Sequence, residues 1–544
     1  MLTINSQNSR DWVLASYYAA DKKNKYNYSK NISNSTEEYV FPNQKLDAFN
    51  IMQLFYAEKK RVVSLQKKTK VGADGLMIEL ATKMCTHIDD EFIIMPENVR
   101  ILTGMSNKNW ETDMIEKTPE CFKNCVFHHG KLKTSELFNL KNSLIIIDEV
   151  DTGSKEQQVL HSTLLDAGLL DVNYMNNNNL FFLFISATMI RELYHLYRWG
   201  NYHALYKMTI PDSYIGHDAF LEKNIIQEFY PLNEFNSDKW VKEDIIENYR
   251  DDYRVHLVRT TNKTIKYIHK SCIKNGIRFL NHTSIDRLSD DDLENIFNSI
   301  DLQHVVVAVK GFFRRANLIP NKWKKKIGCT HELYCKKVDN NVQIQGFPGR
   351  LTGYWKDVIE SGHKTGPYRT SLRAIKEYEE SYLDPFGLNN CYHAEGFSKN
   401  VNGAYFNNKK TSMLHPKHIS NLNPDDLPNP RRDDLYNENF ERGYQVFNNQ
   451  NENEIYAKQF GAKRRSNYKC VNGFKICSTT SLGVKSLNEI IKFATSSKIG
   501  SNLDKKIDTI GIGEFAYRRY VCYEDINNQN TEMYVTIWVK RIKN

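Results

Sequence analysis

The sequence predicts an α/β protein with two parallel-sheet domains in tandem and a C-terminal accessory domain. The main observation is a set of runs that are apolar on both faces and alternate with helical or mixed segments, as strands of a buried parallel sheet do. In the first half of the chain these runs are RVVSL (61–65), EFIIM (91–95), SLIIIDEVD (143–151) and LFFLFISAT (180–188). A second set contains YRVHLVRT (253–260) and HVVVAVKGFF (304–313). From about residue 400 the chain is rich in Asn, Asp and Pro, and it ends in the strand-like run EMYVTIWVKRI (532–542).

Length and composition indicate a globular protein of several domains. A chain of 544 residues with 40% hydrophobic residues is long enough for about two to four domains with sizeable cores. No run of about 18 apolar residues occurs, so we expect no membrane span. The stretch MLTINSQNSRDW has neither the basic nor the apolar segment of a signal peptide, and the 10 cysteines are scattered, as in reduced proteins. We therefore expect a cytoplasmic protein that is not secreted.

The distribution of charge points to a polyanionic partner. The whole chain has a net charge of +9. From Cys391 to Asn544 there are 23 Lys and Arg against 16 Asp and Glu, so this part carries +7. A basic surface of this kind favours nucleic acid as a partner, although a solvated lysine-rich surface would give the same count.

The stretch SLQKKTKVGADGLMIE (64–79) has the form of a phosphate-binding loop without its lysine. A β-type run enters a polar turn, and the helical run GLMIELATKM (75–84) leaves it, an arrangement in which backbone N–H groups bind phosphates. The usual pattern is G-x-x-x-x-G-K-[ST]. If its second glycine is Gly72, Ala73 takes the place of the lysine and Asp74 that of the Ser or Thr. The sequence therefore raises two alternatives, a degenerate nucleotide site or no nucleotide site.

Polar side chains follow two of the predicted strands. SLIIIDEVDTG (143–153) brings Asp148 and Glu149 to the carboxyl end of its strand, where ligands of open α/β sheets bind. One carboxylate there can hold Mg²⁺ while the next polarises an attacking water. The run FLFISAT ends a neighbouring strand with short hydroxyl residues that can hydrogen-bond those carboxylates; these positions are Ser186, Ala187 and Thr188.

These stretches resemble the motifs of superfamily 2 helicases. IIIDEVD followed by FISAT resembles motifs II and III of this family, which includes DEAD-type Walker B boxes, and VVVAVKGFFRRA (305–316) and QIQGFPGRLTGY (343–354) are similar to motifs V and VI. TGMSNKNW (103–110) and VKGFFRR are similar to helicase-like proteins of large DNA viruses and phages. The resemblance covers residues 45 to 370 and implies two RecA-like domains with a nucleotide cleft between them. For a viral protein, the cytoplasmic location would be the host cytoplasm or a virus factory.

The resemblance also gives a domain assignment. We expect an N-terminal extension (1–44), RecA-like domain 1 with the degenerate Walker A loop, the DEVD box and SAT (45–215), RecA-like domain 2 with motifs V and VI (216–385), and a basic, Asn-rich C-terminal accessory domain (386–544).

In the family such a cleft binds ATP and Mg²⁺. The implied nucleotide-binding residues are Thr69, Lys70, Val71, Gly72, Ala73, Asp74 and Gly75. Asp148 would hold Mg²⁺, and Glu149 would orient the attacking water. Arg350 would bind the γ-phosphate, with Gln345 as its polar neighbour. A second arginine, common in motif VI of the family, is replaced by Gly353.

Asp74 adds negative charge at the position where phosphate has to bind. A pair of unit charges about 4 Å apart interacts by roughly 4 kcal/mol at an effective dielectric near 20, here with the repulsive sign. Weak or lost ATP hydrolysis is therefore expected. Two features would rescue binding: charge from Lys67, Lys68 or Lys70 in the same loop, or direct binding of Mg²⁺ by Asp74.

Other residues carry the prediction that DNA or RNA is bound largely without regard to its sequence. In the family the end of the motif V strand contacts the phosphate backbone, and the stretch NKWKKKIG (321–328) mixes lysines with an aromatic ring. The expected nucleic-acid-binding residues are Lys310, Arg314, Arg315, Lys322, Trp323 and Lys324. Two C-terminal stretches, AKRRSNYK (462–469) and AYRRYVCY (516–523), have a similar mixture.

Several functions remain open from the sequence. The first is a pseudo-helicase that binds nucleic acid with little ATP hydrolysis, and the second is an active helicase or translocase with a rewired loop. A nuclease site in the C-terminal region is a third, weaker alternative. Replication, repair or transcription proteins are the expected protein partners. Within CFKNCVFHH (121–129), we interpret the alternating pattern CVFHH (125–129) as a buried strand, rather than reading Cys121, Cys125, His128 and His129 as a zinc site.

Overall fold

The computed structural model divides the chain into two compact units, Met1–Pro385 with His393–Asn423, and Phe386–Tyr392 with Pro424–Asn544. Each unit is described by itself. The structure describes residues 2–30, 32, 35–87, 93–106, 108–153, 158–189, 196–283, 285–298, 303–311, 319–385, 398–400, 440–462, 468–477, 484–495 and 510–542.

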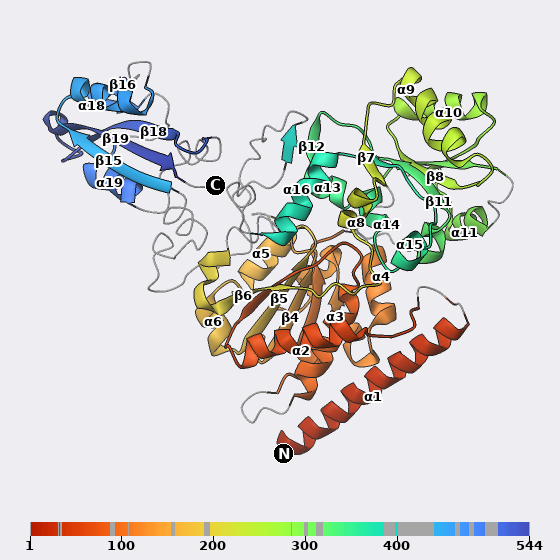
Figure 1. Cartoon of the computed structure of the whole chain (residues 1–544). Coiled ribbons are helices and arrows are strands. Elements are labelled where there is room, and N and C mark those ends of the chain that lie inside the picture. The colour runs from red at the N-terminus through yellow and green to blue at the C-terminus, as the bar shows by residue number, and fades with distance from the viewer. Residues whose placement is uncertain are drawn as a thin grey trace. The chain divides into compact units, whose positions relative to one another are not determined.

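The first sheet of unit 1 has six parallel strands in the order β3-β2-β4-β5-β1-β6 (Figure 1). The strand that carries the DEVD box, β4, pairs with β5, and β5 pairs with β1, which leads into the phosphate-binding-type loop. The strands are β1 (Val62–Gln66), β2 (Val99–Thr103), β3 (Val126–Phe127), β4 (Ser143–Asp148), β5 (Leu180–Ser186) and β6 (His203–Lys207).

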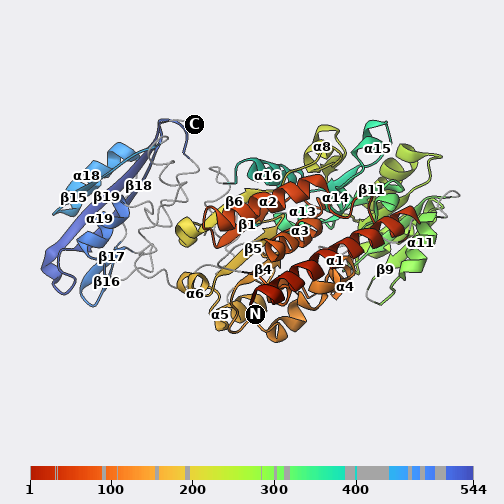
Figure 2. The same cartoon turned by 90° about the horizontal axis from the view of Figure 1, so that it is seen from below.

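Helices cover both faces of this sheet, which explains why β1, β4 and β5 are buried at every position. In β4, Leu144 and Ile146 pack into one core with α2 and α3, whereas Ile145 and Ile147 pack into another core with α5. The long helix α1 packs against α3 (Figure 2). The helices of this half are α1 (Leu2–Ser29), α2 (Pro42–Tyr56), α3 (Ala73–Thr86), α4 (Lys108–Lys117), α5 (Val159–Asp166) and α6 (Val172–Asn177), with the 3-10 helices η1 (Pro96–Asn98), η2 (Glu120–Cys125), η3 (His129–Thr134) and η4 (Leu196–Tyr202).

The second sheet of unit 1 is also parallel and has the strand order β7-β13-β11-β8-β10-β9. Its strands are β7 (Ile226–Glu228), β8 (Val255–Arg259), β9 (Arg278–His282), β10 (Val305–Val309), β11 (Ile327–His331) and β13 (Tyr368–Thr370). A separate two-stranded sheet pairs β12 (Lys337–Asp339) with β14 (Ser398–Asn400). The helices are α8 (His217–Glu222), α9 (Glu234–Lys239), the π-helix η5 (Trp240–Glu247), α10 (Thr264–Lys274), α11 (Asp290–Asn298), α12 (Asn321–Lys324), α13 (Asn340–Ile344), α14 (Phe347–Leu351), α15 (Lys356–Glu360) and α16 (Leu372–Leu383).

Two parallel sheets in tandem, each flanked by helices, confirm the predicted α/β fold class. One predicted strand is wrong. Of EFIIM, residues 93–95 are irregular and 91–92 lie outside the described residues, whereas the strand of this region is β2. The charge of Arg100 interrupts the apolar run of β2, but its guanidinium is buried and donates to the carbonyl groups of Ser135 and Val99.

Unit 2 contains a three-stranded antiparallel sheet in the order β15-β19-β18 and a β-hairpin. Its predicted last strand is confirmed as β19. The core of the unit lies between the sheet and α19. The elements are β15 (Phe440–Phe447), α18 (Gln450–Ala457), η8 (Lys458–Phe460), β16 (Tyr468–Val471), β17 (Phe474–Cys477), α19 (Leu487–Thr495), β18 (Phe515–Tyr523), η9 (Gln529–Thr531) and β19 (Glu532–Arg541). No helix in the described part of the chain combines the length and the apolar character that a membrane span requires.

Buried histidines make the stability of unit 1 dependent on pH. Burial lowers the pKa of His203, His217 and His331 to about 3, and burial next to His304 lowers that of His256. In the unfolded chain a histidine side chain has a pKa of about 6.5. Below that pH the unfolded state binds more protons than the folded state, so stability is lost as the pH falls. We expect the midpoint of thermal unfolding to decrease steadily from pH 7 to pH 5.

His331→Phe is the matched variant for this prediction. A phenyl ring keeps the packing against Tyr230 and Trp240 but takes up no proton. The variant should therefore lose less stability on acidification, by up to about 1.4 kcal/mol per pH unit. A midpoint that stays constant from pH 7 to pH 5 in the unmodified protein would contradict the prediction.

Candidate functional site

The loop after β1 leads into α3 through a residue with a left-handed backbone. Gly72 adopts the left-handed conformation (φ 86°) at the N-cap of α3, and the helix begins at Ala73. Lys70 also has a positive φ, of 57°. The helix therefore starts at the position that the alignment of Gly72 with the second glycine of the pattern requires, and its first backbone N–H groups are oriented toward any ligand at this end.

Hydroxyl groups from both halves of unit 1, Tyr214 from the first and Thr352 and Tyr354 from the second, bind the carbonyl groups of this loop. The hydroxyl of Thr352 donates to the carbonyl oxygen of Thr69 at 2.9 Å, and the phenol of Tyr214 donates to the same oxygen at 2.6 Å. The phenol of Tyr354 donates to the carbonyl oxygen of Val71 at 2.7 Å. The loop is thus fixed from both halves of unit 1.

Lys68 also joins the loop to the second half of unit 1. Its ammonium forms a buried ion pair with Glu379 of α16 and lies 4.3 Å from the ring centroid of Tyr382 on the same helix. Because this charge is fully used in the contact with α16, Lys68 does not provide free positive charge for a ligand.

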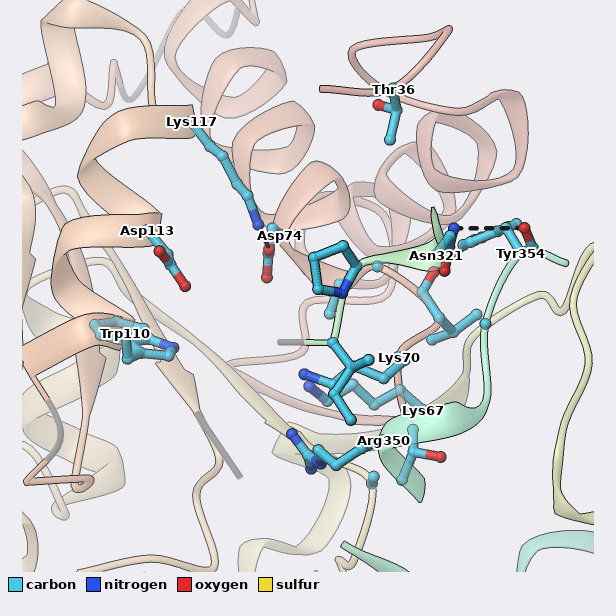
Figure 3. Close-up of a pocket in the computed structure, with 18 of the residues that line it drawn as sticks. Thr36, Lys67, Lys70, Asp74, Trp110, Asp113, Lys117, Asn321, Arg350 and Tyr354 are labelled. Atoms are coloured by element: carbon cyan, nitrogen blue, oxygen red, sulfur yellow. Dashed lines mark hydrogen bonds and ion pairs between the residues drawn. The ribbon is translucent and has the colours of Figure 1, made fainter. Parts of the chain in front are cut away.

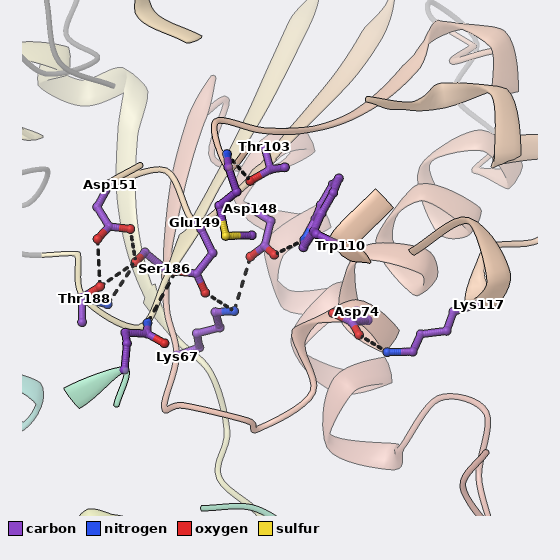
Figure 4. Close-up of polar contacts among 12 residues, drawn as sticks. Lys67, Asp74, Thr103, Trp110, Lys117, Asp148, Glu149, Asp151, Ser186 and Thr188 are labelled. Carbon is purple, nitrogen blue, oxygen red and sulfur yellow. Dashed lines mark hydrogen bonds and ion pairs between the residues drawn. The ribbon is translucent and has the colours of Figure 1, made fainter. Parts of the chain in front are cut away.

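Asp148 and Glu149 lie at the carboxyl end of β4 and are bridged by a lysine (Figure 4). Lys67 Nζ is 3.3 Å from Asp148 Oδ1 and 3.4 Å from Glu149 Oε1. The indole of Trp110 in α4 donates to Asp148 Oδ2 at 2.9 Å. Burial alone would lower the pKa of Lys67, but the two carboxylates outweigh burial and raise it. The ammonium therefore stays charged between them.

Glu149 is also linked to the second half of unit 1. Its backbone has a positive φ of 51°, a conformation that a non-glycine residue adopts at an energetic cost and that occurs often at functional sites. The amide of Gln345 donates to Glu149 Oε2 at 3.5 Å. Arg350 in turn donates to the carbonyl oxygen of Gln345 at 3.1 Å and to its side-chain oxygen. A chain of polar contacts thus runs from Arg350 to Glu149.

The hydroxyl residues of the SAT motif bind a carboxylate, but not those of Asp148 and Glu149. Ser186 and Thr188 each donate to Asp151, at 2.9 Å, in the turn after β4 (Figure 4). Ala187 is buried and lines the pocket described below. The turn after β4 also explains Gly104, since a Cβ there would lie 1.8 Å from the carbonyl oxygen of Thr152.

One pocket of about 410 Å³ brings these groups together (Figure 3). It is lined by the loop from β1, by the carboxylates of β4, by Trp110 and Lys117 of α4 and by the segment with Gln345 and Arg350. Of the residues predicted for the nucleotide, those that line it are Thr69, Lys70, Val71, Gly72, Ala73, Asp74, Asp148, Glu149, Gln345 and Arg350; Gly75 lies in α3 and is not among them.

Positive charge gathers on one side of this pocket. Lys70 and Arg350 point toward the same part of it (Figure 3), and Lys324 also lines it. Burial and the neighbouring charge of Arg350 lower the pKa of Lys70 well below its usual value and that of Lys324 to about 7. An anion in the pocket would relieve this repulsion, so the site is arranged to accept negative charge.

Asp74 does not oppose phosphate as the sequence suggests, because it has a partner. Lys117 Nζ lies 2.6 Å from Asp74 Oδ2. Burial alone would raise the pKa of Asp74, but Lys117 lowers it to about 2. The carboxylate therefore stays ionised and its charge is balanced by the ammonium.

The place of the missing motif VI arginine is also taken by another cation. Gly353 has a φ of 134°, and a Cβ at this position would lie 2.8 Å from Lys324 Nζ. Lys324 donates to the carbonyl oxygen of Thr352 at 2.6 Å. The lysine from α12 thus occupies the space beside Gly353, and it does so inside the pocket.

Aromatic rings and a glutamine border the pocket next to the loop. Phe41 and Tyr354 are stacked with their ring centroids 5.1 Å apart, and both line the pocket. Gln44 accepts from the backbone N–H of Phe41 at 2.9 Å and donates to the carbonyl oxygen of Gly72 at 2.6 Å. A flat aromatic surface beside an amide is suited to a heteroaromatic ring.

The residues present do not fit a divalent cation in this arrangement. Both oxygens of Asp148 accept from other groups, one from Lys67 and one from Trp110. The position of the Ser or Thr ligand is held by Asp74, which is paired with Lys117. Within the described ranges, no group of three or more His, Cys, Asp and Glu side chains is arranged to hold a metal ion.

Two of the predicted nucleic-acid contacts are corrected by burial. Trp323 is 8% exposed and stacks on Phe297 with centroids 4.6 Å apart, so its ring belongs to the core. Lys324 is 3% exposed and faces the pocket. Both residues were expected at the surface because the lysines around Trp323 suggest an exposed stretch.

The other predicted nucleic-acid contacts lie at the surface or outside the described residues. Lys310 is exposed at the end of β10 and donates to Asn262 at 2.8 Å. Lys322 is exposed and paired with Glu294 at 2.6 Å. Arg314 and Arg315 lie outside the described residues, as does 463–467 of the basic stretch AKRRSNYK, whereas AYRRYVCY falls in β18.

The CFKNCVFHH stretch forms only a short strand. β3 comprises Val126–Phe127, while the buried thiols of Cys121 and Cys125 lie in the 3-10 helix η2. His128 Nδ1 lies 3.3 Å from Glu111 Oε2. The strand predicted over 125–129 is therefore confirmed only for Val126–Phe127, because Cys125 ends η2 and His129 begins η3.

Sequence reasoning missed three residues that line the pocket, Phe41, Trp110 and Lys117, and also Gln44, which donates to the carbonyl oxygen of Gly72 beside it. Trp110 belongs to the stretch TGMSNKNW, which was quoted for its resemblance alone. For the other three no local pattern marks a role, because their partners lie far along the chain.

The comparisons with known proteins give a likeness to helicases. No protein-family model matches the sequence, and no curated protein matches it significantly. A solved DEAD box protein from the hyperthermophile Methanococcus jannaschii is similar over 64% of this chain and 95% of its own, with 14% sequence identity and a TM-score of 0.33. S. cerevisiae Dbp5 bound to RNA and ADP BeF3 is similar over 64% of this chain and 92% of its own, with 12% identity and a TM-score of 0.34.

The buried pair between Lys68 and Glu379 should stabilise the contact between the two halves of unit 1. Glu379→Gln would leave the ammonium of Lys68 buried without its counter-charge, which costs about 3–5 kcal/mol in comparable pairs. The double variant Lys68→Met, Glu379→Leu should recover most of this loss, because no charge remains. Thermal and urea unfolding would measure both changes.

The exposed pair Lys322–Glu294, whose side chains are 58% and 38% exposed, provides the control. Glu294→Gln should change the free energy of unfolding by less than about 1 kcal/mol. Equal effects of Glu379→Gln and Glu294→Gln would show that Lys68 does not hold α16 to the loop.

Proposed function

We propose that this protein is a helicase-like nucleic-acid-binding protein whose cleft binds ATP and hydrolyses it slowly or not at all. The observation that carries the proposal is the convergence, on one pocket, of the loop after β1, the carboxylates of β4 and Arg350 from the second half of unit 1. The helicase motifs of the sequence support the same reading.

The pocket offers partners to the phosphates and to the base of ATP. The N-terminal turn of α3 and the loop before it present backbone N–H groups to phosphate oxygens. Lys70, Lys324 and Arg350 supply positive charge for the triphosphate. The stacked rings of Phe41 and Tyr354 lie where a base could pack against an aromatic surface.

Slow hydrolysis follows from the state of the carboxylates. Glu149 would have to polarise an attacking water, but its carboxylate is near Lys67 and accepts from Gln345. ATP could therefore bind in the cleft, whereas Glu149 would have to leave these two contacts before it could accept a proton from water.

An active helicase or translocase is the second candidate. Lys117 balances Asp74, and Lys324 fills the place of the missing arginine, so the charges absent from the motifs are supplied by other elements. In that case ATP would draw Lys67 away from Glu149, and turnover would depend on nucleic acid.

ATP binding and turnover, each with and without single-stranded and duplex nucleic acid, separate the two candidates. We expect measurable binding and a turnover well below about 1 per second, the lower end of common enzyme turnover. Lys324→Met should weaken ATP binding by about tenfold, since a charge contact to phosphate is worth roughly 1.5–3 kcal/mol. The exposed neighbour Lys325 provides the control, and Lys325→Met should leave binding unchanged.

Brisk turnover that rises with nucleic acid would contradict slow hydrolysis and favour the motor. Lack of ATP binding by the unmodified protein would remove the nucleotide site from the proposal.

We further propose that nucleic acid is bound largely through its phosphates, with Lys310, Arg314 and Arg315 among the contacts. Each phosphate contact adds about 0.7–0.9 to the slope of log affinity against log salt. The triple change to Ala should therefore lower that slope by about 2 to 3. Fluorescence anisotropy with labelled single-stranded DNA and RNA, measured over a series of salt concentrations, gives the slope.

A triple Ala variant of the exposed Lys22, Lys23 and Lys45 matches this change in net charge and should keep the slope of the unmodified protein. If the slope stays the same without Lys310, Arg314 and Arg315, the contact lies elsewhere, for instance in the basic C-terminal unit.

A further inference from the structure

The ammonium of Lys67 occupies the place between the two carboxylates of the DEVD box. It lies 3.3 Å from Asp148 and 3.4 Å from Glu149, and the Lys67 side chain is 13% exposed. The backbone N–H of Lys67 donates to the carbonyl oxygen of Ser186 at 3.3 Å. The lysine is therefore anchored at the carboxyl edge of the sheet, with its charged end directed at the acidic pair (Figure 4).

The other oxygens around this place also have donors. Trp110 donates to the second oxygen of Asp148 at 2.9 Å, and Gln345 donates to the second oxygen of Glu149 at 3.5 Å. Asp74, at the start of α3, also has a partner, because Lys117 Nζ lies 2.6 Å from Asp74 Oδ2. A divalent cation would have to displace a tethered ammonium and compete with an indole and an amide.

We propose that the cleft binds its nucleotide as the metal-free polyphosphate, with the ammonium of Lys67 as the resident cation in place of Mg²⁺. This inference rests on the proposed function, since it concerns the same cleft. Lys67 neutralises the acidic pair from within the chain, and Lys70, Lys324 and Arg350 remain to meet the phosphates. Because Mg²⁺ and the ammonium repel each other at this distance, added Mg²⁺ gives the complex no advantage.

The first part of the test uses the metal alone. Mn²⁺ binding followed by electron paramagnetic resonance should show no site of sub-millimolar affinity in the unmodified protein. Lys67→Gln frees the two carboxylates and should create such a site, whereas Lys67→Arg keeps the positive charge and should not. The exposed Lys45 gives the control, and Lys45→Ala should behave as the unmodified protein. Mn²⁺ binding by the unmodified protein at Asp148, lost in Asp148→Asn, would overturn the inference.

The second part compares ATP binding in EDTA and in excess Mg²⁺ by isothermal titration calorimetry. In the unmodified protein and in Lys67→Arg the dissociation constant should be about tenfold or more higher in excess Mg²⁺ than in EDTA, because Mg²⁺ binds ATP in solution and has to be released before the metal-free nucleotide binds. Equal constants under the two conditions would overturn the inference, since the protein would then bind the Mg²⁺ complex as well as the metal-free nucleotide. In Lys67→Gln, Mg²⁺ should tighten ATP binding by about tenfold or more. ATP binding that requires Mg²⁺ in the unmodified protein overturns this inference and leaves the proposed function standing. Absence of ATP binding under both conditions overturns the proposed function, and the inference with it.

Discussion

In unit 1, side chains from both halves hold one short loop, and the rest of the structure depends on these contacts. The loop between β1 and α3 carries its carbonyl oxygens toward hydroxyl groups of Thr352, Tyr214 and Tyr354, and its Lys68 pairs with Glu379 of α16. Loops of this kind are usually held by their own glycines and by the phosphate that they bind. Here side chains that follow β6 and β11 in the sequence supply the contacts, so the geometry of the candidate site and the packing of the two halves are parts of one arrangement.

Lysines from other elements lie where the helicase-like motifs lack positive charge. Asp74 would oppose phosphate, but Lys117 of α4 balances it. Gly353 lacks an arginine, but the ammonium of Lys324 lies beside it. Lys67, at the place of the first glycine of the loop pattern, reaches the acidic pair of β4. Charges that the motifs lack are thus present on other elements, and one of these lysines contacts the carboxylate to which the proposed function assigns hydrolysis.

The strands could be predicted from the sequence because burial on two faces leaves a simple signature. β1, β4 and β5 are buried at every position and mostly apolar, and each was found within a few residues of its observed bounds. β2 was missed since Arg100 breaks its apolar run, and only the fold shows that carbonyl groups satisfy the guanidinium. The residue types of the pocket were also predictable where a motif carries them, as for Asp148, Glu149 and Arg350.

The electrostatic state of the pocket could not be predicted from the sequence. Asp74 and Lys117 are 43 positions apart, and the effect of the carboxylate reverses once its partner is known. Trp323 and Lys324 follow the pattern of an exposed basic stretch, yet one stacks on Phe297 and the other faces the pocket. Such pairings depend on where α4 and α12 pack, which local residue patterns do not specify.

Hydrogen–deuterium exchange with and without ATP tests most directly whether the loop shared by the two sheets is the ligand site. ATP should slow exchange both in the loop and start of α3 (residues 66–76) and in the segment of the second half that contacts the loop (residues 345–355). Protection confined to regions outside both segments, or no change at a saturating ATP concentration, would contradict it.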